Sequence, residues 1–596
     1  MAQPEAQASK AAPGIMRTVV RTPRIEVMLY KSIERKAGEA GLPTSERYAG
    51  KDAGIDITPF LGDGSSVTVS KSCKQISGGF NITFRDKPNS SLAPAENILS
   101  DKNIFTFESV YGLIEPMDQI EIRWWNGEGV CPTPMRIKMR GFISDVTRTR
   151  MMDSNGKPQR VVIINGQDYG KVLQMYQLLY LTDYPGGKSF LTGANIFDQF
   201  GEKAINTITG EQFLQMVVKH AANPILDRLI PKYSPFPREI RVDASAQGVV
   251  NNSYMSEQGT LSDLLTGLLD VGHWNELFIE SREDGEYLVW RPNPYFDLMS
   301  GKMIQPLAPE QYGSDWSMSG SRALPAIVNV TNSKITSIRQ TRTDRDVYNF
   351  YWCNNRRFDM VDDMTRRMQT MMADGHKTTL EYPNTDVSIY GVRLMEGNTV
   401  MGYPDLENMT SGADQAEQDQ RGGLMAEWIQ YRRNVMILTN RDNAVLEKGV
   451  IEMAGGLPKL LAPELMRPGD YLQITEGGLS WLAYVVNLQE TFTPLRGFVA
   501  TVEFERGTGF AERVADPNSP WMDEQRVSPS APNEGFGIGG RGRLTENLPD
   551  PGFVCPNPYA QSRSTTNPTP VSDVPEDWSL ESAFKDIMGI DTPSKK

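Results

Sequence analysis

Apolar and polar side chains alternate in short runs along the first third of the chain. These runs occupy residues 25–30, 67–69, 80–84, 104–107, 120–125, 135–150 and 159–173. A period of two predicts β-strands, and the Gly, Pro, Asn and Asp residues between the runs predict turns. Because successive strands joined by short turns must hide their free edges, we expect residues 21–180 to form a closed or nearly closed antiparallel β-barrel.

One short motif occurs twice. Residues 115–122 read EPMDQIEI and residues 467–474 read RPGDYLQI, so that both place a proline two positions before an aspartate at the start of an alternating run. We expect each aspartate side chain to hold a turn by bonding nearby backbone amides, with a contact between subunits as the alternative role. The four turn residues are Pro116, Asp118, Pro468 and Asp470.

The second copy of the motif is followed by the same series of strands as the first. SWLAYVVNLQETF and FVATVEFERGTGF come after it, separated by a loop. The sequence VYNFYWC at 347–353 is expected to take the place that residues 80–84 take in the first copy. We therefore predict a second, similar barrel over residues 326–510.

Helical spacing separates the two predicted barrels. The apolar residues of 260–270 recur at i, i+3, i+4, i+7 and i+8, and Thr260 is a suitable N-cap. A β-hairpin is expected to follow, with Asp284 and Gly285 in a turn of positive φ. We assign residues 181–325 to an insertion domain of helices and a hairpin, and about 361–435 to a helical insert in the second barrel. The predicted fold class is α+β, mainly β, with α/β insertions.

Three stretches of the sequence resemble one protein family. They are EQGTLSDLLTGLLDVGHWNELFIESREDGEYLVWRPNPY, IEPMDQIEIR and GVIEMAGGLPKLLAPELMRPGDYLQI. In this order they are similar to the late control protein D group, the baseplate hubs of contractile phage tails, to which the hub part of type VI secretion spikes is related. The resemblance covers roughly residues 21–510.

The resemblance implies a structural protein with no cofactor. In that family two barrels per subunit and three subunits make a ring of six, which joins a hexameric tail tube to a trimeric spike. The implied partners are two further copies of the chain, the tube, the spike and other baseplate proteins, with DNA only passing through the channel. The implied location is the virion tail baseplate, assembled in the host cytoplasm. The hub of an injection machine without a genome and a carbohydrate-active barrel protein are the alternatives.

Composition agrees with a structural role. The 596 residues carry a formal charge of −13, whereas duplex-binding proteins depend on clustered basic side chains. The four cysteines, Cys73, Cys131, Cys353 and Cys555, form no CxxC pair, and no apolar run approaches the ~20 residues needed to span a bilayer.

Candidate chemical motifs lack the context that catalysis needs. The glycine-rich stretch 535–542 fits a dinucleotide pattern but stands among prolines, which favours a linker. The three histidines occur in no catalytic or zinc-binding motif. Adjacent acids usually point apart or into water, so we expect a solvated surface at both acidic pairs. The histidines are His220, His273 and His376, and the acidic pairs are Asp344 with Asp346 and Asp362 with Asp363.

Both ends of the chain are predicted to lie outside the barrels. Residues 1–20 are small and polar, which is typical of a mobile arm. Residues 511–596 are rich in Pro, Asn, Ser and Gly and are expected to be an extended tail. Near its end, an amphipathic helix is predicted to dock on a partner. The docking residues are Trp578, Leu580, Phe584, Ile587 and Met588.

Overall fold

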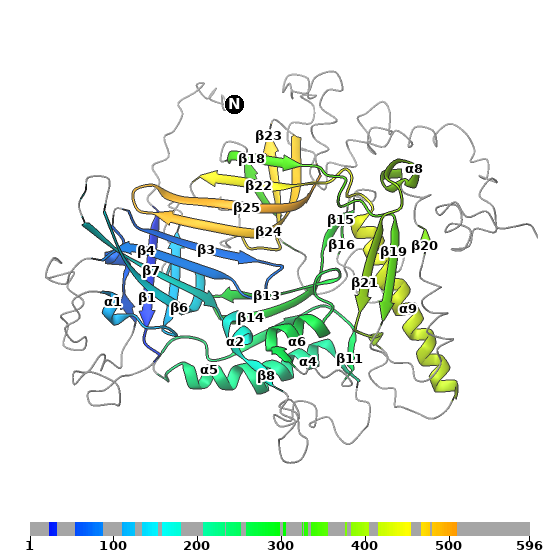
Figure 1. Cartoon of the computed structure of the whole chain (residues 1–596), viewed down its shortest axis with the longest axis horizontal. Helices are drawn as coiled ribbons and strands as arrows, with labels where there is room; N and C mark the ends of the chain where they lie inside the picture. Colours follow the sequence, from blue (N-terminus) through cyan, green and yellow to red (C-terminus); the bar gives the residue numbers. More distant parts are fainter. Residues whose placement is uncertain are drawn as a thin grey trace, which may run out of the picture.

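A computed structural model of the chain shows a mainly β protein, which confirms the predicted fold class. Apart from a few positions within these ranges, the structure describes residues 23–32, 54–86, 110–125, 134–179, 207–251, 258–297, 302–304, 325–355, 376–377, 383–404, 415–454 and 466–508. The largest sheet has 13 strands, and helices lie along one side and one end of it (Figure 1).

The N-terminal strands form one half of this sheet. They are β1 (Arg24–Tyr30), β2 (Ile55–Asp56), β3 (Ser66–Ser72), β4 (Gly79–Arg85), β5 (Gln119–Trp125), β6 (Arg136–Met152) and β7 (Pro158–Asp168), with the short helices η1 (Thr58–Phe60) and α1 (Val110–Leu113). Their order across the sheet is β3-β4-β7-β6-β5-β1-β2. The alternation of apolar and polar residues in the sequence matches the alternation of buried and more exposed side chains in the structure. In β4, Phe80, Ile82 and Phe84 face the core, and the residues between them do not. The predicted strand at 104–107 lies outside the described residues.

The C-terminal strands form the other half of the sheet. They are β17 (Ile327–Thr331), β18 (Ile335–Thr341), β22 (Glu447–Ala454), β23 (Tyr471–Glu476), β24 (Leu479–Thr493) and β25 (Gly497–Gly507). Their apolar residues make a separate core around Val485 and Val502.

Five strands of each half repeat the same arrangement. The first unit, defined as β3 to β7, has the order β3-β4-β7-β6-β5, and the second unit has the order β18-β22-β25-β24-β23. All neighbours within both units are antiparallel. Beyond these strands the halves differ, because β1 joins β5 antiparallel whereas β17 joins β23 in parallel. Closure of either unit into a barrel stays a prediction.

The repeat corrects one sequence-based expectation. The place of β4 in the second unit belongs to β22 and not to residues 347–353. Part of that stretch forms β19 (Phe350–Asn355), which pairs with β20 (His376–Lys377) and β21 (Leu394–Thr399) in a small sheet of its own. Local alternation identifies a strand but does not say which sheet the strand will join.

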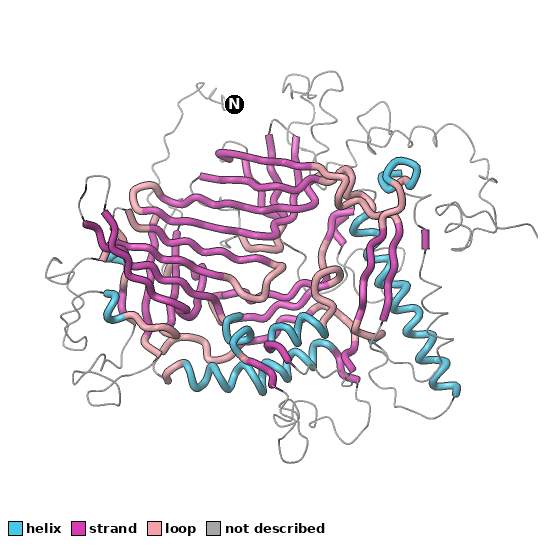
Figure 2. The backbone as a smooth tube through the Cα atoms, viewed as in Figure 1, coloured by secondary structure: helices cyan, strands magenta, loops and turns pink. Residues whose placement is uncertain are grey.

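The two units are joined by direct strand pairing, which we call the junction. Residues 67–72 of β3 pair antiparallel with residues 487–492 of β24. Because β24 continues past the end of β23, its outer half offers a free edge that β3 fills. Figure 2 shows the strands of both units running side by side as one sheet.

An insertion between the units carries five of the described helices. Its elements are α2 (Gly170–Met175), β8 (Gln177–Leu179), β9 (Thr207–Thr209), α4 (Gly210–Val217), η5 (Val218–Ala222), α5 (Asn223–Leu229), β10 (Ile240–Ala244), β11 (Val249–Asn251), β12 (Gln258–Thr260), α6 (Leu261–Leu268), β13 (Asn275–Arg282), β14 (Gly285–Pro292), β15 (Tyr295–Asp297) and β16 (Lys302–Ile304). Thr260 caps α6 in a reciprocal pair of bonds with Asp263, as predicted.

The predicted hairpin is present as β13 and β14, but its turn differs from the expectation. Arg282 pairs directly with Gly285, so the two-residue loop is Glu283 and Asp284. The positive φ expected at Asp284 and Gly285 is wrong, because neither is among the described residues with positive φ.

A second insert lies between β18 and β22. Besides the small sheet it contains η8 (Pro383–Thr385), α8 (Val387–Tyr390) and α9 (Gln415–Asn440). Trp428 of α9 packs into the same core as Trp274 and Trp290 of the first insertion. The two inserts are therefore one packed body beside the large sheet (Figure 1).

Candidate functional site

The first Pro-x-Asp turn is closed by bonds between Glu115 and Asp118. The Asp118 carboxylate accepts the amide of Glu115 at 2.8 Å, and the Asp118 amide donates to the Glu115 carbonyl at 3.2 Å. Met117 has a φ of 70°, the left-handed conformation that a type II turn requires. The turn is attached to β6, because the Ile143 amide donates to the Asp118 carbonyl at 2.9 Å and the Met117 amide donates to the Ile143 carbonyl at 2.8 Å.

The second turn reproduces this set of bonds one by one. The Asp470 carboxylate accepts the Arg467 amide at 3.0 Å, and the Asp470 amide donates to the Arg467 carbonyl at 3.3 Å. Gly469 has a φ of 87°. The Val485 amide donates to the Asp470 carbonyl at 2.9 Å, and the Gly469 amide donates to the Val485 carbonyl at 2.7 Å. Val485 thus takes the role that Ile143 has in the first unit. The repeat therefore extends from the sequence to individual hydrogen bonds.

A β-bulge follows each turn at the matching position. In the first unit the register shifts between Ile143 and Asp145, and in the second between Val485 and Asn487. A bulge bends its strand and increases the local twist. Both long strands, β6 and β24, therefore bend at the point where they leave β5 and β23.

The surroundings of the two aspartates differ. Lys31 donates to the Asp118 carboxylate at 2.6 Å, and both side chains are buried. Burial raises the pKa of Asp118, and Lys31 opposes this effect. At the second turn Arg291 binds the Gly469 carbonyl at 2.8 Å, and burial raises the pKa of Asp470 to about 6. The same turn is thus stabilised by a lysine–carboxylate pair in one unit and by an arginine–carbonyl bond in the other.

The junction buries an ion pair and aromatic side chains as well as backbone bonds. Lys138 of β6 pairs with Glu490 of β24, and the Lys138 ammonium lies 5.3 Å from the centroid of the Trp124 ring. Phe498 of the second unit packs against Trp124 with centroids 4.9 Å apart, and Phe492 joins the same core. Side chains of the second unit thus complete the core of the first.

The hairpin β13–β14, which we call the clamp hairpin, contacts the first unit through a buried cluster of charges. Arg140 of β6 donates to Glu286 at 3.1 Å, to Glu121 at 2.9 Å and to the Arg282 carbonyl at 2.9 Å. Burial raises the pKa of Glu286 to about 7. Arg140 therefore links β5, β6 and the clamp hairpin.

The same hairpin contacts the second unit from its other end. Arg291 donates to Glu276 at 2.9 Å in addition to its bond with the Gly469 carbonyl. The Tyr484 hydroxyl of β24 also donates to Glu276. The clamp hairpin thus binds both units, which fixes their relative orientation together with the junction.

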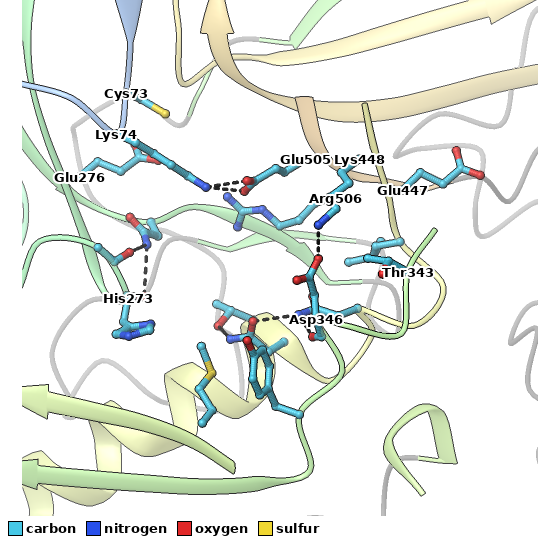
Figure 3. A pocket seen from close by; sticks show the side chains of 18 of the residues that line it. Cys73, Lys74, His273, Glu276, Thr343, Asp346, Glu447, Lys448, Glu505 and Arg506 are labelled. Carbon is cyan, nitrogen blue, oxygen red and sulfur yellow. Dashed lines mark hydrogen bonds and ion pairs between the residues drawn. The ribbon is translucent and has the colours of Figure 1, made fainter. Parts of the chain in front are cut away.

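A polar cleft of about 510 Å³ lies between the two units and the inserts. Figure 3 shows Lys74 pointing toward Glu505 on one side and Lys448 toward Asp346 on another. Lys74 Nζ is 2.6 Å from Glu505 Oε1, and this pair is partly exposed. Opposite charges in the cleft thus neutralise one another, which suits a solvated groove.

Two cleft residues are of types used in catalysis, and burial shifts both of them toward the neutral form. Burial lowers the pKa of His273 and raises that of the Cys73 thiol well above its ordinary value. A reactive cysteine requires a thiolate, so the environment of Cys73 is that of a structural cysteine.

The remaining candidate residues are dispersed. Asp344 pairs with Arg393 at 2.9 Å and Asp346 with Lys448, so each acid of this pair has its own cation. His220 lies in η5 and His376 in β20. In the described part of the chain, no group of His, Cys, Asp or Glu side chains is placed to hold a metal ion. No helix described by the structure is long and apolar enough to cross a bilayer.

Several predicted positions lie outside the described residues. They are Cys131, Cys555, the acidic pair Asp362 and Asp363, the glycine-rich stretch 535–542 and the docking residues Trp578, Leu580, Phe584, Ile587 and Met588.

Some residues that organise the site were missed in the sequence. Lys31, Lys138 and Glu490 each stand within or directly after an apolar alternating run. A charged residue at such a position has to find a partner when the strand is buried. This signal identifies the residues, although it does not identify their partners.

No family model and no curated protein matches the chain. Solved structures do match. The tail protein of Neisseria meningitidis is 11% identical, with a TM-score of 0.38, and the match covers 81% of this chain and 96% of that one. The 43 kDa tail protein of a Shewanella oneidensis prophage is 12% identical, with a TM-score of 0.38 and coverage of 81% and 98%. An Escherichia coli component of the type VI secretion system is 7% identical, with a TM-score of 0.28 and coverage of 74% and 73%.

Proposed function

We propose that this chain is the baseplate hub of a contractile phage tail. Three copies form a ring of six units, which joins the hexameric tail tube to the trimeric spike and frames the channel through which DNA leaves. The role is structural, and the residues singled out above act by fixing geometry.

The repeated unit is the observation that carries this proposal. Two units with the same strand order, the same turn bonds and the same bulge are joined side by side in one chain. Three such chains around a threefold axis present six similar surfaces to a sixfold partner and three identical surfaces to a threefold partner. The sequence resemblance to tail hubs supports the same assignment, and one of its three stretches, residues 257–295, lies outside the repeat.

The rigid connection between the units fits this role. The junction and the clamp hairpin hold the two units with buried charges and shared aromatic packing. A ring that transmits force between tube and spike needs units that do not shift against one another. The formal charge of −13 favours a channel that DNA passes without binding.

We further propose that the C-terminal segment fastens a partner. Its predicted helix presents Leu580, Phe584, Ile587 and Met588 on one face with Trp578 at the edge, and the segment before it serves as a tether. Deletion of residues 576–596 is expected to leave trimers intact while tails lose a component. Tails of full composition and normal infectivity after this deletion would contradict the docking role.

The molar mass of the purified chain in solution tests the central proposal. We expect a trimer, and class averages of single particles seen end-on are expected to show a ring with six lobes. The measurement is repeated with the spike present, because the spike adds its own threefold contacts. A chain that remains monomeric at all concentrations and with the spike would overturn the hub assignment.

A further inference from the structure

Among the strands that the structure describes, two edges lack the partner that their counterparts in the other unit have. In the first unit β3 is the outermost strand, and it pairs with β24 across the junction. Its counterpart in the second unit is β18, and β18 ends the 13-stranded sheet. Among the described residues β18 pairs only with β22.

The other edge belongs to the outer half of β6. In the second unit, β24 pairs with β23 over its first half and with β3 over its second half. In the first unit, β6 pairs with β5 only up to Phe142, and among the described strands nothing pairs with this side of residues 145–150. This half of β6 is the counterpart of the half of β24 that receives β3.

The exposure of side chains on β18 and on the outer half of β6 agrees with the absence of a partner strand among the described residues. Val67 of β3 is fully buried at the junction, whereas its counterpart in β18, Ile338, is 42% exposed. In β6, Asp145, Thr147 and Arg150 are exposed. An exposed edge strand is a template for pairing with another chain.

We infer that β18 of one copy of this chain pairs with residues 145–150 of β6 in the next copy. This seam repeats the junction between chains, and the inference rests on the proposed trimeric hub. Each chain supplies one β18 edge and one β6 edge, so the contact is heterologous and closes when three chains form the ring.

The repeat also fixes the register of the seam. Val69 and Gln340 are counterparts because they hold the same place relative to the bulge of their own unit. Each pairs with a residue of the neighbouring strand, and that residue pairs in turn with the residue opposite the bulge. Val69 pairs with Glu490, whose counterpart after the bulge is Arg148. Gln340 is therefore placed opposite Arg148, with an antiparallel course.

Neighbouring pairs in this register are compatible in charge. Arg339 falls opposite Thr149 and Ile338 opposite Arg150, so no like charges lie directly opposite. The seam is more polar than the junction, where Phe492 occupies the position corresponding to Arg150. A polar seam suits strands that must stay soluble before the ring assembles.

A disulfide between chains tests the seam. Thr68 and Thr491, the junction counterparts of Arg339 and Thr149, have hydroxyl oxygens 3.0 Å apart, so cysteines at the matching seam positions are within bonding reach. The variant is Arg339→Cys with Thr149→Cys in the full-length chain, oxidised and analysed on non-reducing gels. We expect covalent species of two and three chains, which neither single variant forms.

Two matched controls define the geometry. Thr68→Cys with Thr491→Cys should form a disulfide without any gain in mass, since the junction lies within one chain. Arg339→Cys with Thr147→Cys shifts the pair by two residues and should link at most a few per cent of the chains. Equal linking of the shifted and matched pairs would overturn the register.

The mass of the unlinked protein separates the seam from the hub assignment. Trimers in solution without linking of the matched pair would overturn the seam and leave the hub assignment standing. A chain that is monomeric under every condition, spike included, would contradict both. Linking of the matched pair in trimers supports the seam.

Discussion

Thr68 and Thr491 are separated by 423 positions in the sequence, and their hydroxyl oxygens lie 3.0 Å apart where β3 meets β24. This contact lies within a backbone pairing that runs from residue 67 to residue 72 of β3. The two units are therefore parts of one sheet and not separate domains on a linker. Forming the junction requires segments 423 positions apart to meet, and we expect this step to be slow in folding because loop closure costs entropy.

The buried pair of Lys138 and Glu490 is predicted to be essential for the junction. Their side chains are 7% and 3% exposed, so removing one charge leaves the other buried without compensation. We expect Lys138→Met to lower the free energy of unfolding by about 3–5 kcal/mol, measured by urea titration. The double variant Lys138→Met with Glu490→Leu should recover most of this loss.

The exposed pair of Lys74 and Glu505 is the matched control for this prediction. Its side chains are 53% and 40% exposed, and exposed pairs contribute about 1 kcal/mol or less. If Lys74→Met destabilises the protein as much as Lys138→Met does, burial is not the cause of the effect.

Asp470 is predicted to make the protein less stable as the pH rises. Burial raises the pKa of this carboxyl to about 6, so the folded protein holds the proton more tightly than the unfolded chain does. Its stabilising effect is fully present below about pH 4 and is lost as the pH rises to about 6. A shift of about two pKa units corresponds to about 3 kcal/mol.

Asp470→Asn isolates this effect. An asparagine oxygen can still accept the Arg467 amide, and the side chain does not ionise. We expect the variant to gain about 3 kcal/mol on the wild type between pH 4 and pH 7, measured as the difference in unfolding free energy. Other buried carboxyls, such as Glu286, titrate in both proteins, so their contributions cancel in the difference. A difference that does not change with pH would contradict the prediction.

Asp118→Asn is expected to have a smaller effect than Asp470→Asn, although the turn is the same. Burial raises the pKa of Asp118 as it raises that of Asp470, but the Lys31 ammonium lies 2.6 Å from the Asp118 carboxylate and opposes this effect. We expect the gain in unfolding free energy between pH 4 and pH 7 to be smaller than the gain of Asp470→Asn. Lys31→Met removes the opposing charge and should destabilise the protein by about 3 kcal/mol at neutral pH, and adding Asp118→Asn should recover much of this loss. A gain for Asp118→Asn alone as large as that for Asp470→Asn would show that Lys31 does not oppose the effect of burial.

The turns could be predicted from the sequence because their bonds are local. Proline sets the first φ, and the aspartate three positions after Glu115 or Arg467 reaches back to that residue's amide. The N-cap at Thr260 is readable for the same reason, since its partner Asp263 is three residues away. In each case the interacting atoms lie within one turn of chain.

Partners that are distant in sequence could not be predicted in this way. The stretch 347–353 alternates as a strand should, yet β22 occupies the position assigned to it, because pairing is decided by packing against β25. Likewise, nothing local to Lys138 indicates that its counter-charge is Glu490. The duplication itself supplies part of the missing information, because the strand order, turn bonds and bulge of one unit predict those of the other.

Gly469 is predicted to tolerate no side chain, whereas its counterpart position holds Met117. Both residues have positive φ, which costs an L-residue about 1–2 kcal/mol. A Cβ at 469 would lie 2.0 Å from Nη2 of Arg291, and this guanidinium is held by Glu276 and by the Gly469 carbonyl. We expect Gly469→Ala to lower the free energy of unfolding by about 3 kcal/mol or more, because conformational strain and a clash act together.

Gly156 separates the conformational strain from the clash with Arg291. It has a φ of 70° and nothing within 4 Å of an added Cβ, so Gly156→Ala should lose only the conformational cost of about 1 kcal/mol. Met117→Gly relieves the strain of the positive φ in the first turn but also removes a half-buried side chain. Because the two effects oppose each other, the unfolding free energy should stay within about 1 kcal/mol of the wild type. Urea titration of the three variants gives the comparison. Equal losses for Gly469→Ala and Gly156→Ala would show that Arg291 yields to the new methyl group, and that the clamp hairpin holds the second turn less tightly than its hydrogen bonds indicate.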